Sequence, residues 1–189
     1  SIILTNAKYF RLISYPAKLA KLFSFLLPRK IKNMINLMPT NFPKKNIDQK
    51  EVYRAKGKKI ARVALLTGCV QKELSPQINE ATIRLLNRHG IEVVTPKKIR
   101  CCGSLNHHLG KEEDASLDFI NNINVWYEEY KKGNLDAILS NTSGCGTTLK
   151  DYGFIFRGDK NLKDKAKIIS KLSKDVTEYL SENLKLKII

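Results

Sequence analysis

The sequence predicts a small three-layer α/β domain with a mainly parallel sheet of about three or four strands, preceded by a helical extension. Three short, mostly apolar runs, at residues 61–66, 91–95 and 137–140, have the length and composition of buried strands. Helical patterns separate these runs, and strands that alternate with helices pair in parallel through right-handed crossovers. With 189 residues, 42% of them hydrophobic, the chain can bury one core of ordinary size plus peripheral helices.

Two helices are expected between these strands. The first begins at Ser75 and Pro76 and runs to His89, because proline suits a first helical turn and Gly90 can cap a helix end. The second covers residues 114–132. Helical spacing predicts that its core-facing side chains are Leu117, Ile120, Ile123 and Tyr127.

Three segments divide the chain. Residues 1–38 are expected to form two or three short, basic, amphipathic helices, and residues 39–59 a linker rich in proline, lysine, asparagine and aspartate. Residues 60–189 form the α/β domain, which is expected to end with one helix over 162–183.

The apolar face of the first segment has two interpretations. It packs against the rest of the protein, as most amphipathic helices do, or it lies on an anionic membrane. The face consists of Leu19, Leu22, Phe23 and Leu26. The basic side chains that would attract anionic lipid are Lys18, Lys21, Arg29, Lys30 and Lys32.

The overall charge indicates an anionic partner without naming it. Lysine and arginine number 34 against 18 aspartates and glutamates, a net charge of +16. No stripe of arginines interleaved with aromatic residues is present, so we expect no nucleic-acid binding. The remaining candidates for the anionic partner are an acidic protein and a lipid surface.

Four cysteines, two of them adjacent, are not the framework of a small secreted domain, and a reducing cytoplasm is expected. If the basic segment binds lipid, the protein is peripheral on the inner face of the cell membrane. No signal-peptide cleavage site follows the apolar start, and charged residues interrupt any spanning helix there. The chain begins with Ser1, and we expect it to be a fragment of a longer protein.

The four cysteines follow three successive predicted strands. Cys69 comes after the first strand, Cys101 and Cys102 after the second, and Cys145 after the third. Loops that leave the carboxyl ends of parallel strands meet at one edge of a sheet, where ligands bind. We therefore expect the four thiols to converge.

Four soft thiolate ligands suit either an iron-sulfur cluster or zinc. The adjacent pair favours a cluster of several irons, because zinc sites use cysteines two to four residues apart. Zinc, a disulfide or metal-free thiols remain alternatives. Glycines that let the backbone approach a bulky ligand flank the cysteines, at Gly68, Gly103, Gly144 and Gly146.

His107 and His108 follow the double cysteine closely. Either is a candidate ligand or a hydrogen-bond donor to a cluster sulfur, and the alternative is a loop or helix-start histidine with partners of its own. Asp151 and Tyr152 close the third loop and could shape the pocket, or serve as a helix-start acid and a core aromatic.

Three stretches carry a family resemblance: VALLTGCVQKELSPQINEATIRLLNRHGIEVV, CCGSLNHHLG and SNTSGCGTTLKDYG. They resemble the cysteine-rich CCG domain of glycolate oxidase iron-sulfur subunits, a group that also includes lactate-utilisation proteins and the cluster subunit of heterodisulfide reductase. The resemblance covers about residues 60–180.

This resemblance implies an electron-transfer role. It implies a [4Fe-4S] cluster on Cys69, Cys101, Cys102 and Cys145, flavin-containing partner subunits that oxidise glycolate, and onward transfer to membrane quinone. A ferredoxin-like part of the same subunit, absent from this sequence, is also implied.

One departure bears on the cluster. The last motif of the heterodisulfide reductase relative is Cys-X-X-Cys and holds a noncubane cluster, whereas Thr148 stands three residues after Cys145 here. The resemblance therefore leaves open a differently ligated or incomplete cluster. A protein of another class, a zinc-binding or metal-free interaction scaffold, is the alternative.

Overall fold

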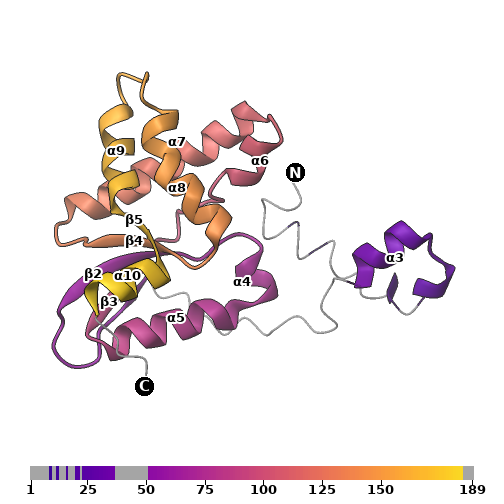
Figure 1. Cartoon of the computed structure of the whole chain (residues 1–189), viewed down its shortest axis with the longest axis horizontal. Helices are drawn as coiled ribbons and strands as arrows, with labels where there is room; N and C mark the ends of the chain where they lie inside the picture. Colours follow the sequence, from indigo (N-terminus) through magenta and orange to yellow (C-terminus); the bar gives the residue numbers. More distant parts are fainter. Residues whose placement is uncertain are drawn as a thin grey trace.

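The computed structural model describes residues 9, 12, 16, 20, 21, 23–36 and 51–184. Within them a five-stranded sheet has the order β1-β3-β2-β4-β5, in which only the edge strand β1 is antiparallel to its neighbour (Figure 1). The strands are β1 (Val52–Tyr53), β2 (Ala61–Leu66), β3 (Ile91–Val94), β4 (Ala137–Ser140) and β5 (Ser173–Asp175). The predicted α/β class and mainly parallel sheet are confirmed, with five strands where three or four were expected.

The described helices of the α/β unit cover both faces of this sheet (Figure 1). They are α4 (Gln71–Leu74), α5 (Pro76–Arg88), α6 (Ser104–His108), α7 (Glu112–Lys131), α8 (Ser143–Ile155), α9 (Lys163–Leu172) and α10 (Val176–Asn183). Before the sheet lie a short 3-10 helix, η1 (Ser24–Leu26), and α3 (Arg29–Asn36).

Side chains of alternating strand residues build a core on each face of the sheet. On one face Ala64 and Ile138 pack with side chains of α7, α8 and α9, including Trp126. On the other face Val63 and Leu139 pack with side chains of α5 and α10. This alternation follows from the two-residue period of a strand and produces the predicted three layers.

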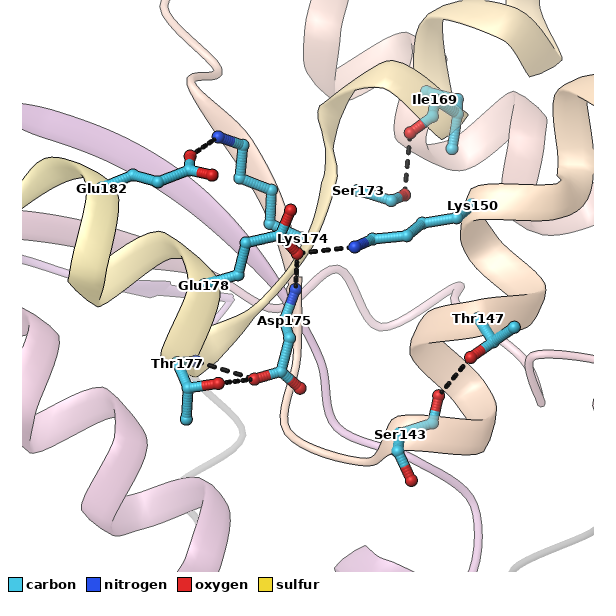
Figure 2. A network of polar contacts seen from close by, with 10 residues as sticks. All are labelled: Ser143, Thr147, Lys150, Ile169, Ser173, Lys174, Asp175, Thr177, Glu178 and Glu182. Atoms are coloured by element: carbon cyan, nitrogen blue, oxygen red, sulfur yellow. Dashed lines mark hydrogen bonds and ion pairs between the residues drawn. The ribbon is translucent and has the colours of Figure 1, made fainter.

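The predicted single helix over 162–183 is wrong. The chain instead forms α9, adds β5 beside β4 and then starts α10. Asp175 ends the strand and caps α10: its carboxylate accepts a hydrogen bond from Thr177 N, and Glu178 accepts one from Asp175 N (Figure 2). This capping box makes a new helix start inside a continuous helical pattern.

The predicted core face of α7 is partly wrong. Leu117 is 62% exposed and Ile120 is 36% exposed, whereas Ile123 is buried as expected. The buried face also contains Asn122, which is fully inaccessible. Because asparagine is polar, an apolar pattern leaves Asn122 out. The predicted core face is therefore displaced around the helix from the buried face.

The sequence pattern does not predict α8, because most of its residues have the composition of a loop. Gly144, Gly146 and Gly153 lower the intrinsic helix propensity of this stretch. Its helix is held by packing instead, because Leu149 and Tyr152 are fully buried in the core. Asp151 consequently lies inside a helix and not at its start.

The amino-terminal extension is described only in part. Leu19 and Leu22, half of the predicted apolar face, lie outside the described side chains, and so do residues 39–50 of the predicted linker. Phe23 and Leu26 are exposed. Val52 and Tyr53, also in the stretch predicted as linker, form the edge strand of the sheet. None of the described helices is long and apolar enough to cross a membrane.

Candidate metal centre

Four cysteine thiols meet where three parallel strands end. Cys69 follows β2, Cys101 and Cys102 lie in the loop after β3, and Cys145 lies in the first turn of α8, after β4. The Sγ atoms of Cys69 and Cys101 are 3.5 Å apart, and those of Cys102 and Cys145 are 3.1 Å apart. The convergence that the strand order predicted is therefore present.

The four thiols differ in their exposure to solvent. Cys101 and Cys102 are 6% and 4% exposed, while Cys69 and Cys145 are half-buried. All four are free thiols. The group thus has an inner side inside the core and an outer side that is partly exposed to solvent.

The thiols strongly influence one another's ionisation. Contact with Cys102, together with burial, raises the pKa of Cys101 to about 11. The pKa of Cys102 is raised to about 12, because the Cys145 contact and burial outweigh the lowering effect of Cys101. The hydrogen bond with Cys101 and burial raise the pKa of Cys69 far above its usual range. Only the pKa of Cys145 is lowered, by the hydrogen bond that Cys102 donates.

These pKa shifts indicate that the thiols lack a nearby positive charge. Several thiolates packed together in a buried site repel one another, so Cys69, Cys101 and Cys102 hold their protons more strongly than an exposed thiol does. A metal ion or cluster supplies that charge and displaces the protons. The chemistry of the donor set therefore fits a metal group better than a cluster of free thiolates.

The sulfur spacing does not form a cage for a single ion. Four sulfurs bonded at 2.3 Å around tetrahedral zinc would be about 3.8 Å apart. Both sulfur–sulfur contacts in the structure, 3.1 and 3.5 Å, are shorter. Across the described part of the chain, no three histidine, cysteine or acidic side chains are arranged around one metal position. Binding requires the thiols to separate.

Two buried side chains fix the backbone of the double cysteine. Asn122 Nδ2 donates to the carbonyl oxygen of Cys101 at 2.7 Å, and its Oδ1 accepts from Arg100 N at 2.9 Å. The hydroxyl of Tyr152 donates to the carbonyl oxygen of Cys102 at 2.9 Å. The sequence alone does not single out Asn122, because an asparagine in this helix resembles a surface residue until its distant partners are known. The sequence predicts that Tyr152 either shapes the pocket or serves as a core aromatic. It is a core aromatic whose hydroxyl also contacts the double cysteine.

The glycines beside the cysteines act in different ways. Gly103 has φ +80°, and a Cβ there would lie 2.2 Å from the ring of Phe119. Gly68 has φ +72° in the turn before Cys69. A Cβ on Gly146 would lie 3.4 Å from Ser140, whereas Gly144 has open space around it. Only the first two positions therefore require glycine for their backbone conformation.

The two candidate histidines lie in α6, directly after the double cysteine. His107 Nδ1 is 3.2 Å from a carboxylate oxygen of Glu112, and its ring lies edge-on to Phe119. The ring of His108 is 5.7 Å from that of His107. The imidazole of His107 thus has a carboxylate partner of its own.

Thr148, the residue in place of a further cysteine, is buried one helical turn after Cys145. Its hydroxyl donates to the carbonyl oxygen of Gly144 at 3.1 Å. The hydroxyl is therefore already used inside α8.

Comparison with known proteins identifies the domain. Residues 63–150 match the family described as the CCG cysteine-rich domain. This part of the chain is a CCG cysteine-rich domain. The resemblance that the three sequence stretches carry is confirmed, and the matched stretch contains all four cysteines.

Several relatives of this CCG domain carry iron-sulfur names. The chain is 40% identical over 121 residues to the glycolate oxidase iron-sulfur subunit of Escherichia coli (strain K12), covering 64% of this chain and 30% of that protein. It is 32% identical over 133 residues to an uncharacterized iron-sulfur protein of Methanocaldococcus jannaschii, covering 70% and 23%. It is 26% identical over 125 residues to lactate utilization protein A of Geobacillus sp. (strain WCH70), covering 66% and 50%.

The chain spans half the length or less of these three relatives. No solved structure matches it.

Proposed function

We propose that this CCG domain binds an iron-sulfur cluster and transfers electrons within a dehydrogenase of 2-hydroxy acids. The observation that carries the proposal is the convergence of four cysteine sulfurs from three loops at one edge of the sheet. The names of the relatives, which include a glycolate oxidase iron-sulfur subunit, support it.

The ligands in this proposal are Cys69, Cys101, Cys102 and Cys145. Adjacent cysteines suit a group with several metal atoms, because each thiolate can bond a different iron. When bound, a [4Fe-4S] cluster takes up and releases one electron at a time. Burial of Cys101 and Cys102 keeps water from the inner side, and half-buried Cys69 and Cys145 leave an outer side for electron exchange.

The proposed substrate and partners rest on the family resemblance and not on the geometry. We infer that the electrons come from glycolate through a flavin-containing subunit, pass a ferredoxin-like part of the same subunit, and continue toward quinone. This chain needs no acid, base or nucleophile for that role. We therefore expect the whole complex to oxidise glycolate only when this domain is intact.

A peripheral position on an anionic membrane is part of the proposal. No acidic residue occurs before Asp48, whereas basic residues are frequent there. Phe25 and Leu26 are 73% and 70% exposed beside Arg29, the first residue of α3. Exposed apolar side chains next to basic ones are typical of a surface that binds anionic lipid.

Iron and acid-labile sulfide analysis after anaerobic reconstitution tests the cluster. We expect bound iron and sulfide and broad visible absorption in the wild-type chain, and a loss of iron in Cys102→Ser. Glu129→Gln, a change in an ion pair away from the cysteines, is the control and should keep its iron. Equal iron in wild type and Cys102→Ser would contradict the ligand assignment.

The same measurement separates the alternatives. A colourless protein with stoichiometric zinc would identify a zinc-binding module, and a protein without metal would identify a scaffold.

A further inference from the structure

A network of side-chain amides and hydroxyls lies between the loops that carry Cys69 and Cys145. Gln71 Nε2 donates to Asn79 Oδ1 at 3.0 Å and to Asn141 Oδ1 at 2.8 Å. Asn141 Nδ2 donates to Asn79 Oδ1 at 2.9 Å and to Thr82 Oγ1 at 3.1 Å. The hydroxyl of Thr142 hydrogen-bonds to Gln71 Oε1. The three amides therefore bond one another directly.

The network is close to saturated. Both amide hydrogens of Gln71 and both of Asn141 are used, and the hydroxyl of Thr82 donates to Ile78 O while it accepts from Asn141. Asn79, which is fully buried, accepts two hydrogen bonds and donates one to the carbonyl oxygen of Thr67 at 2.8 Å. Removal of one member leaves several partners unpaired, and unpaired buried polar groups are costly.

The placement of the network is specific to the cysteine loops. Gln71 stands two residues after Cys69, and Asn141 stands four residues before Cys145. Asn79, on α5, accepts hydrogen bonds from both loops and also donates one to the carbonyl oxygen of Thr67, two residues before Cys69. The loops after β2 and β4 are thus joined by side chains as well as by the sheet.

The ends of β2 and β4 do not need these side-chain hydrogen bonds to stay together. The strands β2 and β4 are already paired along their length, up to Leu66 and Ser140. Three amides with fixed donor and acceptor directions define the distance between the loops more narrowly than apolar packing does. The two half-buried cysteines lie on those loops, and each of them must move away from its contact in the double cysteine to accept a metal group.

We propose that Gln71, Asn79 and Asn141 are positioning residues that set the separation of the Cys69 and Cys145 loops, and thereby the geometry in which the thiols receive an iron-sulfur group. The first part of this proposal, that these residues join the two loops, depends only on the hydrogen bonds. Its consequence for iron rests on the proposed function.

The test uses two variants of the full chain that keep side-chain size. Gln71→Met removes the bonds to both asparagines, and Asn141→Leu removes the bonds to Gln71, Asn79 and Thr82. The control is Glu129→Gln, which weakens a bond to Arg62 near the start of β2, at the opposite end of the strands from the cysteines.

The first measurement is backbone hydrogen exchange of the metal-free protein. Each variant should speed exchange about tenfold in both loops, 67–73 and 141–146. The reason is that removal of either side chain breaks the hydrogen bonds that join the two loops. The control should leave both loops unchanged. Faster exchange confined to the substituted loop would overturn the proposal that the amides join them.

The second measurement is iron release to a chelator after reconstitution with iron and sulfide. Residues that orient metal ligands typically change metal affinity about 10- to 100-fold, so we expect faster release in both variants and a shifted electron paramagnetic resonance spectrum. Wild-type rates and spectra in variants that lose thermal stability would overturn the positioning role. A wild-type chain that takes up no iron would overturn the proposed function, and the exchange result would still decide whether the loops are joined.

Discussion

The hydroxyl of Tyr152 donates a hydrogen bond to the carbonyl oxygen of Cys102, 50 residues away in the sequence, at 2.9 Å. The tyrosine is fully buried, and burial raises the pKa of its hydroxyl well above the usual value, so the group remains a donor at physiological pH. This bond connects the middle of α8, the helix whose first turn contains Cys145, with the loop of the double cysteine.

Tyr152→Phe tests this connection. The substitution removes the donor and leaves the buried carbonyl oxygen of Cys102 without it, which should lower the free energy of unfolding by about 1–3 kcal/mol. Urea denaturation of the metal-free protein measures the change. Because phenylalanine keeps the ring packed against Phe119, a loss close to zero would mean that the bond contributes nothing to stability.

Gly103→Ala tests whether the turn after the double cysteine requires glycine. An added Cβ would meet both an unfavourable φ of +80° and the ring of Phe119, 2.2 Å away. We expect a loss of about 2–4 kcal/mol from backbone strain and overpacking together.

Gly110→Ala is the matched control for that substitution. Gly110 has φ +71°, but nothing lies within 4 Å of the added Cβ. Backbone strain alone should cost about 1–2 kcal/mol. If thermal denaturation shows equal losses at the two glycines, the contact with Phe119 is not a constraint on the cysteine loop.

The apolar runs and the helix ends at glycines were the reliable signals in the sequence. They located β2 and β4 and the end of α5 at Gly90, which has φ +77°. The same strands placed the four cysteines at one edge, because parallel strands put successive carboxyl ends together.

Tertiary interactions decided the features that the sequence did not predict. The helix α8 contains three glycines and depends on the burial of Leu149 and Tyr152. The buried amides of Asn79 and Asn122 resemble surface residues until their partners, distant in sequence, are known. Local patterns thus located the cysteines, whereas the side chains that orient them required the three-dimensional structure.

Asp175→Ala tests why the carboxyl-terminal helical pattern divides into α9 and α10. Removal of the capping carboxylate should lower the free energy of unfolding by about 1 kcal/mol, measured by urea denaturation. The control is Glu182→Ala, which removes the surface ion pair with Lys174 shown in Figure 2 and should cost only about 0.2–0.5 kcal/mol. A loss at Asp175 no larger than that at Glu182 would leave the break between the helices without this explanation.

The ion pair of Glu129 with Arg62, at 2.8 Å, predicts a pH-dependent contribution to stability. Burial acts to raise the pKa of Glu129, but the hydrogen bonds from Lys132 and Arg62 outweigh it, and the net pKa lies below the usual value. A carboxyl with a depressed pKa stabilises the folded state above its unfolded pKa of about 4.3, and this contribution is lost as the pH falls through the folded value. Glu129→Gln should therefore be less stable than the wild type at pH 7, and the difference should shrink as the pH falls below about 4. Urea denaturation of both proteins at several pH values measures this difference. A difference that stays constant down to acid pH would show that the substitution acts through packing and not through the charge of Glu129.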